Sequence, residues 1–85
     1  MAAKTFRARV TVTLKNGVLD PQGKAIEGSL AALGFEGVES VRQGKIFDIS
    51  VEAASKKDAE VKLAKMADKL LANTVIEDFS LEITG

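Results

Sequence analysis

Residues 14–24 read LKNGVLDPQGK and join an alternating apolar pattern to a helical one. Asn16-Gly17 is a turn pair that tolerates positive φ, Asp20 is a preferred N-cap residue, and Pro21 suits the first position of a helix. The stretch therefore predicts a strand that ends before a tight turn and a helix that begins after Asp20.

Val18 and Leu19 place two apolar side chains inside this otherwise polar connection. Such residues either tuck beneath the following helix or meet another chain. The tuck is the commoner arrangement for loop hydrophobes, and binding loops are the rarer one. The sequence leaves both interpretations open.

The composition favours a single domain over residues 1–85 with no chemistry of its own. The chain has 12 Lys and Arg against 12 Asp and Glu, so it lacks the basic field that non-specific nucleic-acid binding needs. It has no Cys and no His, which removes the thiolate nucleophile, the usual metal ligands and the usual general base. No apolar run approaches membrane-spanning length. We expect a cytoplasmic protein without catalytic, cofactor or metal residues and without nucleic-acid or membrane partners.

Hydrophobic periodicity predicts two helices and four strands. Residues 5–15 alternate, with Phe6, Ala8, Val10, Val12 and Leu14 on one face. A helix is expected from Pro21 to Leu33, with Gly34 as its left-handed stop. Residues 38–43 and 45–53 indicate two strands joined by a tight turn at Gln43-Gly44. Ser55 begins a second helix that ends at Asn73, and residues 75–84 form the last strand.

This order of elements predicts an α+β fold, a βαββαβ split-βαβ (ferredoxin-like) plait. Its four-stranded antiparallel sheet would carry both helices on one face, with residues 5–15 between residues 45–53 and 75–84. The basic side chains of the first strand would then lie between acidic ones on both neighbours. The open face is either a solvated, self-neutralising surface or a surface for a second copy.

The plait also occurs in RNA-binding domains, which stack bases on aromatic residues of the exposed sheet face. Here Phe6 and Phe47 share the register of the aliphatic core, so that function is excluded. Arg42 and Lys45 flank the predicted hairpin turn, where backbone N–H groups either face an anion or remain solvated. Neither a phosphate-binding glycine loop nor a metal-ligand spacing occurs in the sequence.

Four blocks, in this order along the chain, carry a resemblance to a known family: GVLDPQG (17–23), LGF (33–35), VRQGK (41–45), and LLAN (70–73) with IED (76–78). Together they resemble the PurS family, the small subunit of multi-subunit phosphoribosylformylglycinamidine synthase. One departure is Thr74, which stands where the family usually has a proline, and it leaves the exit of the second helix open.

The resemblance implies a non-catalytic assembly subunit in de novo purine biosynthesis. Formylglycinamide ribonucleotide, glutamine and ATP would be converted by a PurQ-type glutaminase and a PurL-type synthetase, with ATP and Mg belonging to the synthetase. The chain itself would bind no cofactor and would form a homodimer or higher oligomer. The candidate interface residues are Gly17, Val18, Leu19, Asp20, Pro21, Gln22, Gly23, Arg42, Gly44, Lys45 and Asn73.

Two other classes share the plait. An ACT-like dimeric module senses small ligands, and the Asn16-Gly17 turn would then be its ligand loop. A small enzyme such as an acylphosphatase needs an arginine in the loop after the first strand, and this loop carries Lys15 and Lys24 instead.

Overall fold

A long central strand, β1 (Lys4–Leu14), organises the computed structural model, which describes residues 3–85. It is followed by α1 (Pro21–Ala32), β2 (Gly44–Ala53), α2 (Lys56–Met66), a π-helical turn η1 (Ala67–Leu71) and β3 (Glu77–Ile83). The strands form an antiparallel sheet of order β2-β1-β3. Val10, for example, lies opposite Phe47 on one side and Leu81 on the other. The predicted central place of the first strand is confirmed.

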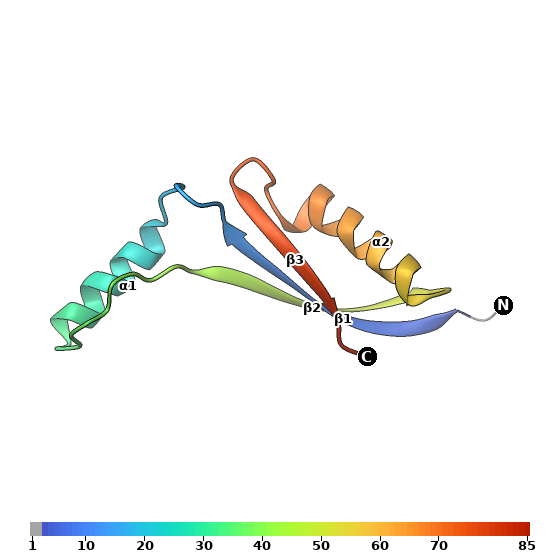
Figure 1. The fold of residues 1–85 in the computed structure, drawn as a ribbon, viewed down its shortest axis with the longest axis horizontal. Coiled ribbons are helices and arrows are strands. Elements are labelled where there is room, and N and C mark those ends of the chain that lie inside the picture. The colour runs from blue at the N-terminus through green and yellow to red at the C-terminus, as the bar shows by residue number, and fades with distance from the viewer. Residues whose placement is uncertain (1–2) are drawn as a thin grey trace.

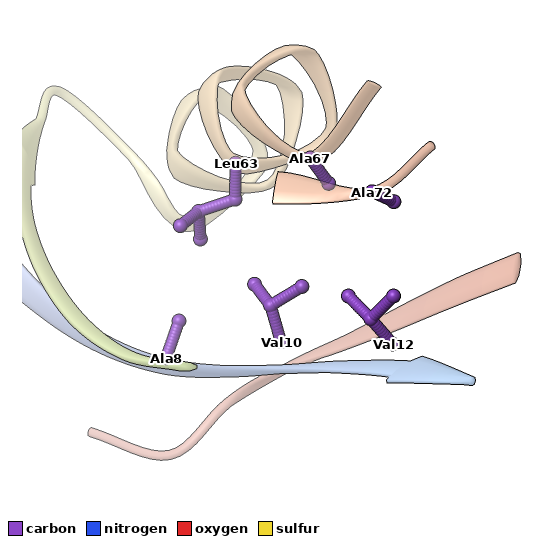
Figure 2. Close-up of a cluster of buried hydrophobic side chains, with 6 residues drawn as sticks. All are labelled: Ala8, Val10, Val12, Leu63, Ala67 and Ala72. Atoms are coloured by element: carbon purple, nitrogen blue, oxygen red, sulfur yellow. The ribbon is translucent and has the colours of Figure 1, made fainter. Parts of the chain in front are cut away.

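The alternation of β1 produces the core. Ala8, Val10 and Val12 point to the face that α2 covers, and all three are buried. Figure 2 shows them facing Leu63, Ala67 and Ala72, which come from α2, η1 and the residue after η1. Ser55 caps α2 as predicted, because its hydroxyl oxygen accepts the amide N–H of Asp58 at 3.1 Å.

Opposite charges pair across the open face of the sheet. Arg9 Nε lies 2.9 Å from Asp48 Oδ1, and Lys15 Nζ lies 3.6 Å from Asp78 Oδ1. The hydrogen bond between Arg9 and Asp48 lowers the pKa of Asp48 and raises the pKa of Arg9. The side chains of Arg9, Asp48 and Asp78 are more than half exposed, and that of Lys15 is 42% exposed. Ion pairs as exposed as these stabilise a fold by about 0–1 kcal/mol.

The prediction of a strand at residues 38–43 is wrong. The sheet described within residues 3–85 has three strands, and Gly44 is the first residue of β2, paired with Thr13, instead of a hairpin-turn residue. Residues 38–43 have no strand partner in the sheet. Side chains satisfy two of their backbone donors: Val41 N donates to Glu27 and Gln43 N to Asp20.

The predicted packing of both helices on one face is also wrong. Figure 1 shows α1 at the opposite end of the molecule from α2, reached by the chain segments that leave β1 and enter β2. The hydrophobic core described within residues 3–85 contains no residue of α1. The Cα radius of gyration is 16.9 Å, whereas a compact domain of this length has about 12 Å. The chain is therefore an α+β fold with an extended limb, not a four-stranded plait.

The end of the second helix differs from prediction as well. Asn73 does not adopt the left-handed conformation, since within residues 3–85 only glycines have positive φ. The helix ends in η1 instead, where Ala72 N donates to the Ala67 carbonyl at 2.9 Å. Asn73 opens the turn that leads to β3: its side-chain oxygen accepts Val75 N, and its carbonyl accepts Ile76 N and Glu77 N.

Among residues 3–85, no helix combines the length and the apolar character needed to cross a membrane.

Candidate interaction site at the junction of sheet and arm

We call residues 21–40 the arm; they comprise α1 and the extended segment that returns from it. Two crossings connect the arm to the sheet, an outgoing one (residues 14–20) and a return one (residues 41–45), and together they form the junction. Ten of the eleven candidate residues lie at the junction or in the first turn of α1. The sequence blocks 17–23 and 41–45, far apart in the chain, are thus brought side by side.

The outgoing crossing has the predicted local structure. Val18 N donates to the Lys15 carbonyl at 3.1 Å, and Gly17 has a φ of +85°, which favours glycine. Asp20 is the N-cap of α1, with its Oδ1 accepting Gly23 N at 2.9 Å, and Pro21 is the first helical residue. Val18 is half-buried and Leu19 is 69% exposed. Neither side chain is therefore fully buried beneath the helix.

Asp20 links the two crossings. Its second carboxylate oxygen, Oδ2, accepts the amide N–H of Gln43 at 2.7 Å, and the residue is only 7% exposed. The N–H groups of Gln43 and Gly23, together with the positive charge of Arg42, lower the pKa of Asp20. The carboxylate is therefore ionised near neutral pH, and each of its oxygens accepts one backbone N–H.

Arg42 links the crossings in the opposite direction. Its Nη1 donates to the Val18 carbonyl at 3.3 Å, and its Nη2 lies 3.2 Å from the carbonyls of both Leu14 and Lys15. A planar guanidinium carries several donors in a fixed fork and can serve several carbonyls at once. The guanidinium thus binds three backbone carbonyls of the outgoing crossing.

Two glycines allow the backbones to come close. A Cβ on Gly23 would collide with the carbonyl oxygen of Val41, and a Cβ on Gly44 would lie 2.7 Å from the carbonyl oxygen of Val12. Neither Gly23 nor Gly44 has a positive φ. Both glycines serve close approach instead of turn geometry.

Lys45 and Asn73 are connected through a residue that the sequence did not single out. Glu77 accepts Asn73 N at 2.7 Å through Oε1, and its Oε2 lies 3.9 Å from Lys45 Nζ. Glu77 also borders a hollow of about 180 Å³ with Gln22, Gly44 and Lys45. Asn73 therefore lies outside the junction, in the turn before β3, and contacts it through Glu77, the first residue of β3.

Sequence reasoning missed Glu27, Gln43 and Glu77. Glu27 Oε2 accepts Val41 N at 3.1 Å, and Gln43 takes part through its backbone N–H alone. No local motif marks such long-range contacts. The only signals were the positions of Gln43 inside the block 41–45 and of Glu77 inside the block 76–78.

The junction consists mainly of backbone groups held by hydrogen bonds, and it does not resemble a reaction centre. Within residues 3–85 no group of three or more Asp and Glu side chains gathers where it could hold a metal ion. The buried carboxylate of Asp20 is occupied by backbone donors. The arrangement can hold the outgoing and return crossings at a fixed position relative to each other, and it leaves the arm exposed to other chains.

Comparison with known proteins identifies the family. The family model PurS, described as phosphoribosylformylglycinamidine (FGAM) synthase, matches residues 7–85. The chain belongs to the PurS family. The PurS subunit of phosphoribosylformylglycinamidine synthase from Synechocystis is 45% identical over 81 residues, which cover 95% of this chain and 81% of that subunit.

Solved PurS structures share the fold. Bacillus subtilis PurS superposes with a TM-score of 0.85 at 41% identity, covering 94% of this chain and 99% of the other. A chain in the structure of PurLQS from Thermotoga maritima superposes with a TM-score of 0.87 at 29% identity, covering 95% and 99%. The extended limb is thus part of a fold that solved PurS chains share over nearly their whole length.

Proposed function

We propose that this chain is the non-catalytic assembly subunit of a multi-subunit phosphoribosylformylglycinamidine synthase. In this role it brings a PurQ-type glutaminase and a PurL-type synthetase together for glutamine-dependent synthesis of formylglycinamidine ribonucleotide. Membership of the PurS family and the likeness to a chain of the Thermotoga maritima PurLQS structure support this role.

The observation that carries the proposal is the uncovered arm. Every residue from 31 to 40 is exposed, and Leu33, Phe35 and Val38 are among them with exposed fractions of 74%, 60% and 42%. Large apolar side chains gathered on a projecting limb are typical of surfaces that meet other chains. We infer that the arm is covered on assembly, and that isolated chains self-associate to a dimer or higher oligomer.

The chemistry belongs to the partners. Release of ammonia from glutamine needs an activated thiolate, and this chain has no Cys. In the proposed complex, ATP and Mg act at the synthetase. Its contribution is to keep the two sites close, because a linked arrangement raises the effective concentration of ammonia at the second site. The site of action is the cytoplasm.

Family membership favours this role over the two rival classes. The proposed ligand loop of an ACT-like module, Asn16-Gly17, is here an exposed turn at the surface of the outgoing crossing. The acylphosphatase class needs an arginine in that loop. Arg42 does contact the loop, but its guanidinium is engaged with three backbone carbonyls.

Sedimentation velocity of purified subunits tests the proposal. PurL-type and PurQ-type partners are mixed with glutamine and ATP, with and without this chain. We expect a single co-sedimenting species only when the chain is present. A glutaminase–synthetase complex of equal stability without the chain would contradict the assembly role.

A further inference from the structure

The arm lacks the apolar packing that normally fixes a helix to its domain. The only buried residue of α1 is Gly23, and within residues 3–85 the core is built from β1, the segment Leu63–Ala72 and their neighbours in β2 and β3. Figure 1 shows that the arm projects beyond the sheet, with the two crossings between them. Two unlinked crossings would act as a hinge, because segments with few buried apolar contacts open readily.

Asp20 and Arg42 tie these two crossings to each other reciprocally. Asp20 belongs to the outgoing crossing and holds Gln43 N of the return crossing at 2.7 Å. Arg42 belongs to the return crossing and holds carbonyls of the outgoing crossing at 3.2–3.3 Å. Each side chain reaches from its own segment to the other, so rotation of one crossing relative to the other breaks hydrogen bonds from both.

The linkage extends into the first two turns of α1. Val41 N donates to Glu27 Oε2 at 3.1 Å, and the Val41 carbonyl lies against Gly23, where no larger residue fits. Three successive residues, 41, 42 and 43, thus contact α1 or the outgoing crossing. A local helix cap would require only the bond from Gly23 N to Asp20.

We propose that Asp20 and Arg42 form a clamp that fixes the direction of the arm relative to the sheet, and that both are positioning residues for assembly. The functional half of this inference rests on the assembly role proposed above. A fixed direction matters because ordering a mobile limb on binding opposes association. A clamped arm meets its partner surface already in place.

Distance measurement between spin labels tests the clamp directly. The chain has no native Cys, so Ser29→Cys in α1 and Glu60→Cys in α2 give one label on each exposed helix. Labelled chains are diluted with unlabelled ones so that only distances within one chain are read. The parent chain should give a narrow distance distribution.

Two variants remove the clamp in different ways. Arg42→Ala removes all three carbonyl contacts. Asp20→Asn keeps the shape of the side chain but serves only one of the two amide donors, since an amide group has a single acceptor oxygen. In both, the distribution should broaden roughly twofold or more, because the crossings then sample several relative orientations. Arg42→Lys should not restore the narrow distribution, since a single ammonium group cannot donate to three carbonyls in the way that the planar guanidinium does.

Two control variants match these changes. Ser55→Ala removes a helix cap of the same geometry, but from α2, and Arg7→Ala removes an exposed arginine of β1. Neither should change the width of the distribution, although Ser55→Ala lowers stability. A broadened distribution with unchanged helix content in the two clamp variants alone supports the clamp.

Glutamine-dependent synthesis in the reconstituted complex gives the second readout. Clamp variants should require a several-fold higher concentration of this chain for half-maximal rate, with the saturated rate retained. An unchanged narrow distribution in Arg42→Ala and Asp20→Asn overturns the clamp. A broadened distribution with unaltered concentration dependence overturns its role in assembly. If the parent chain itself gives no stimulation, the proposed function fails and the distance result still decides the clamp.

Discussion

Asp20 and Arg42 hold the same two chain segments together, each reaching from its own segment to the other: the Asp20 carboxylate accepts Gln43 N at 2.7 Å, and the Arg42 guanidinium donates to the Val18 carbonyl at 3.3 Å. These polar contacts take the place of a hydrophobic core between α1 and the sheet. Two kinds of interaction therefore stabilise the molecule. Apolar packing holds α2 on the sheet, and hydrogen bonds at the junction hold the arm.

The two glycines of α1 should respond in opposite ways to substitution by alanine. Gly23→Ala places a Cβ against the Val41 carbonyl and the Asp20 carboxylate, so it should lower the Tm and displace the return crossing. Gly28→Ala meets no atom within 4 Å and should raise stability by about 0.5–1 kcal/mol, because alanine loses less backbone entropy in a helix. Thermal unfolding of both variants measures the contrast. Equal effects would mean that the close approach at Gly23 has no energetic weight.

The core around β1 should depend strongly on one leucine of α2. Leu63 is fully buried against Ala8 and Val10, so Leu63→Ala should reduce the free energy of unfolding by about 2–5 kcal/mol. Leu70 is 84% exposed, and Leu70→Ala should change it by no more than about 0.5 kcal/mol. Urea unfolding at one fixed protein concentration gives both values. A loss at Leu70 as large as that at Leu63 would place the core elsewhere.

Acid should weaken the junction through Asp20. Hydrogen bonds from Gln43 N and Gly23 N lower its pKa in the folded chain below the ordinary value of 3.8. A lowered carboxyl pKa adds stability above the unfolded-state pKa, and that stability is lost as the pH falls through the folded-state pKa. The Tm difference between the parent and Asp20→Asn should therefore be constant near neutral pH and shrink in strong acid. A difference that does not vary with pH would show that ionisation of Asp20 is irrelevant.

The exposed apolar residues of the arm should govern association and leave folding nearly unchanged. The double variant Leu33→Ser with Phe35→Ser alters side chains that are 74% and 60% exposed. Far-UV circular dichroism should match the parent, while light scattering should show a smaller mean mass. Val61→Ser, at an exposed position of α2, is the control and should leave the mass unchanged. A parent chain that is already monomeric at micromolar concentration would contradict self-association.

The sequence predicted elements whose signals are local. Alternation identified β1 and its buried face, and Ser55 and Asp20 were recognised as caps. Gly34 was predicted as a left-handed stop, and its φ is +93°. Ten of the eleven candidate residues are gathered near the junction because they lie in two blocks that the structure brings together. Which residues share a face or cap a helix is fixed by neighbours in the chain.

The errors concern contacts between distant segments. The apolar residues of α1 show that the helix needs a covered face, but periodicity does not tell whether its own sheet or another chain covers it. Residues 38–43 carry the β-branched Val38 and Val41 without a clean alternation. The backbone donors of Val41 and Gln43 go to Glu27 and Asp20 instead of to a neighbouring strand. Asn73 is of a residue type that tolerates the left-handed conformation, but the helix already ends before it, at the π-helical turn η1.

Reconstituted synthesis of formylglycinamidine ribonucleotide tests the central claim most directly. The rate is measured with purified glutaminase and synthetase subunits, with and without this chain, once with glutamine and once with high ammonia as nitrogen source. Omitting the chain should abolish or greatly reduce the glutamine-dependent rate and leave the ammonia-driven rate nearly intact, because proximity of the two sites matters only for ammonia made in the complex. An undiminished glutamine-dependent rate without the chain would contradict its role as the assembly subunit.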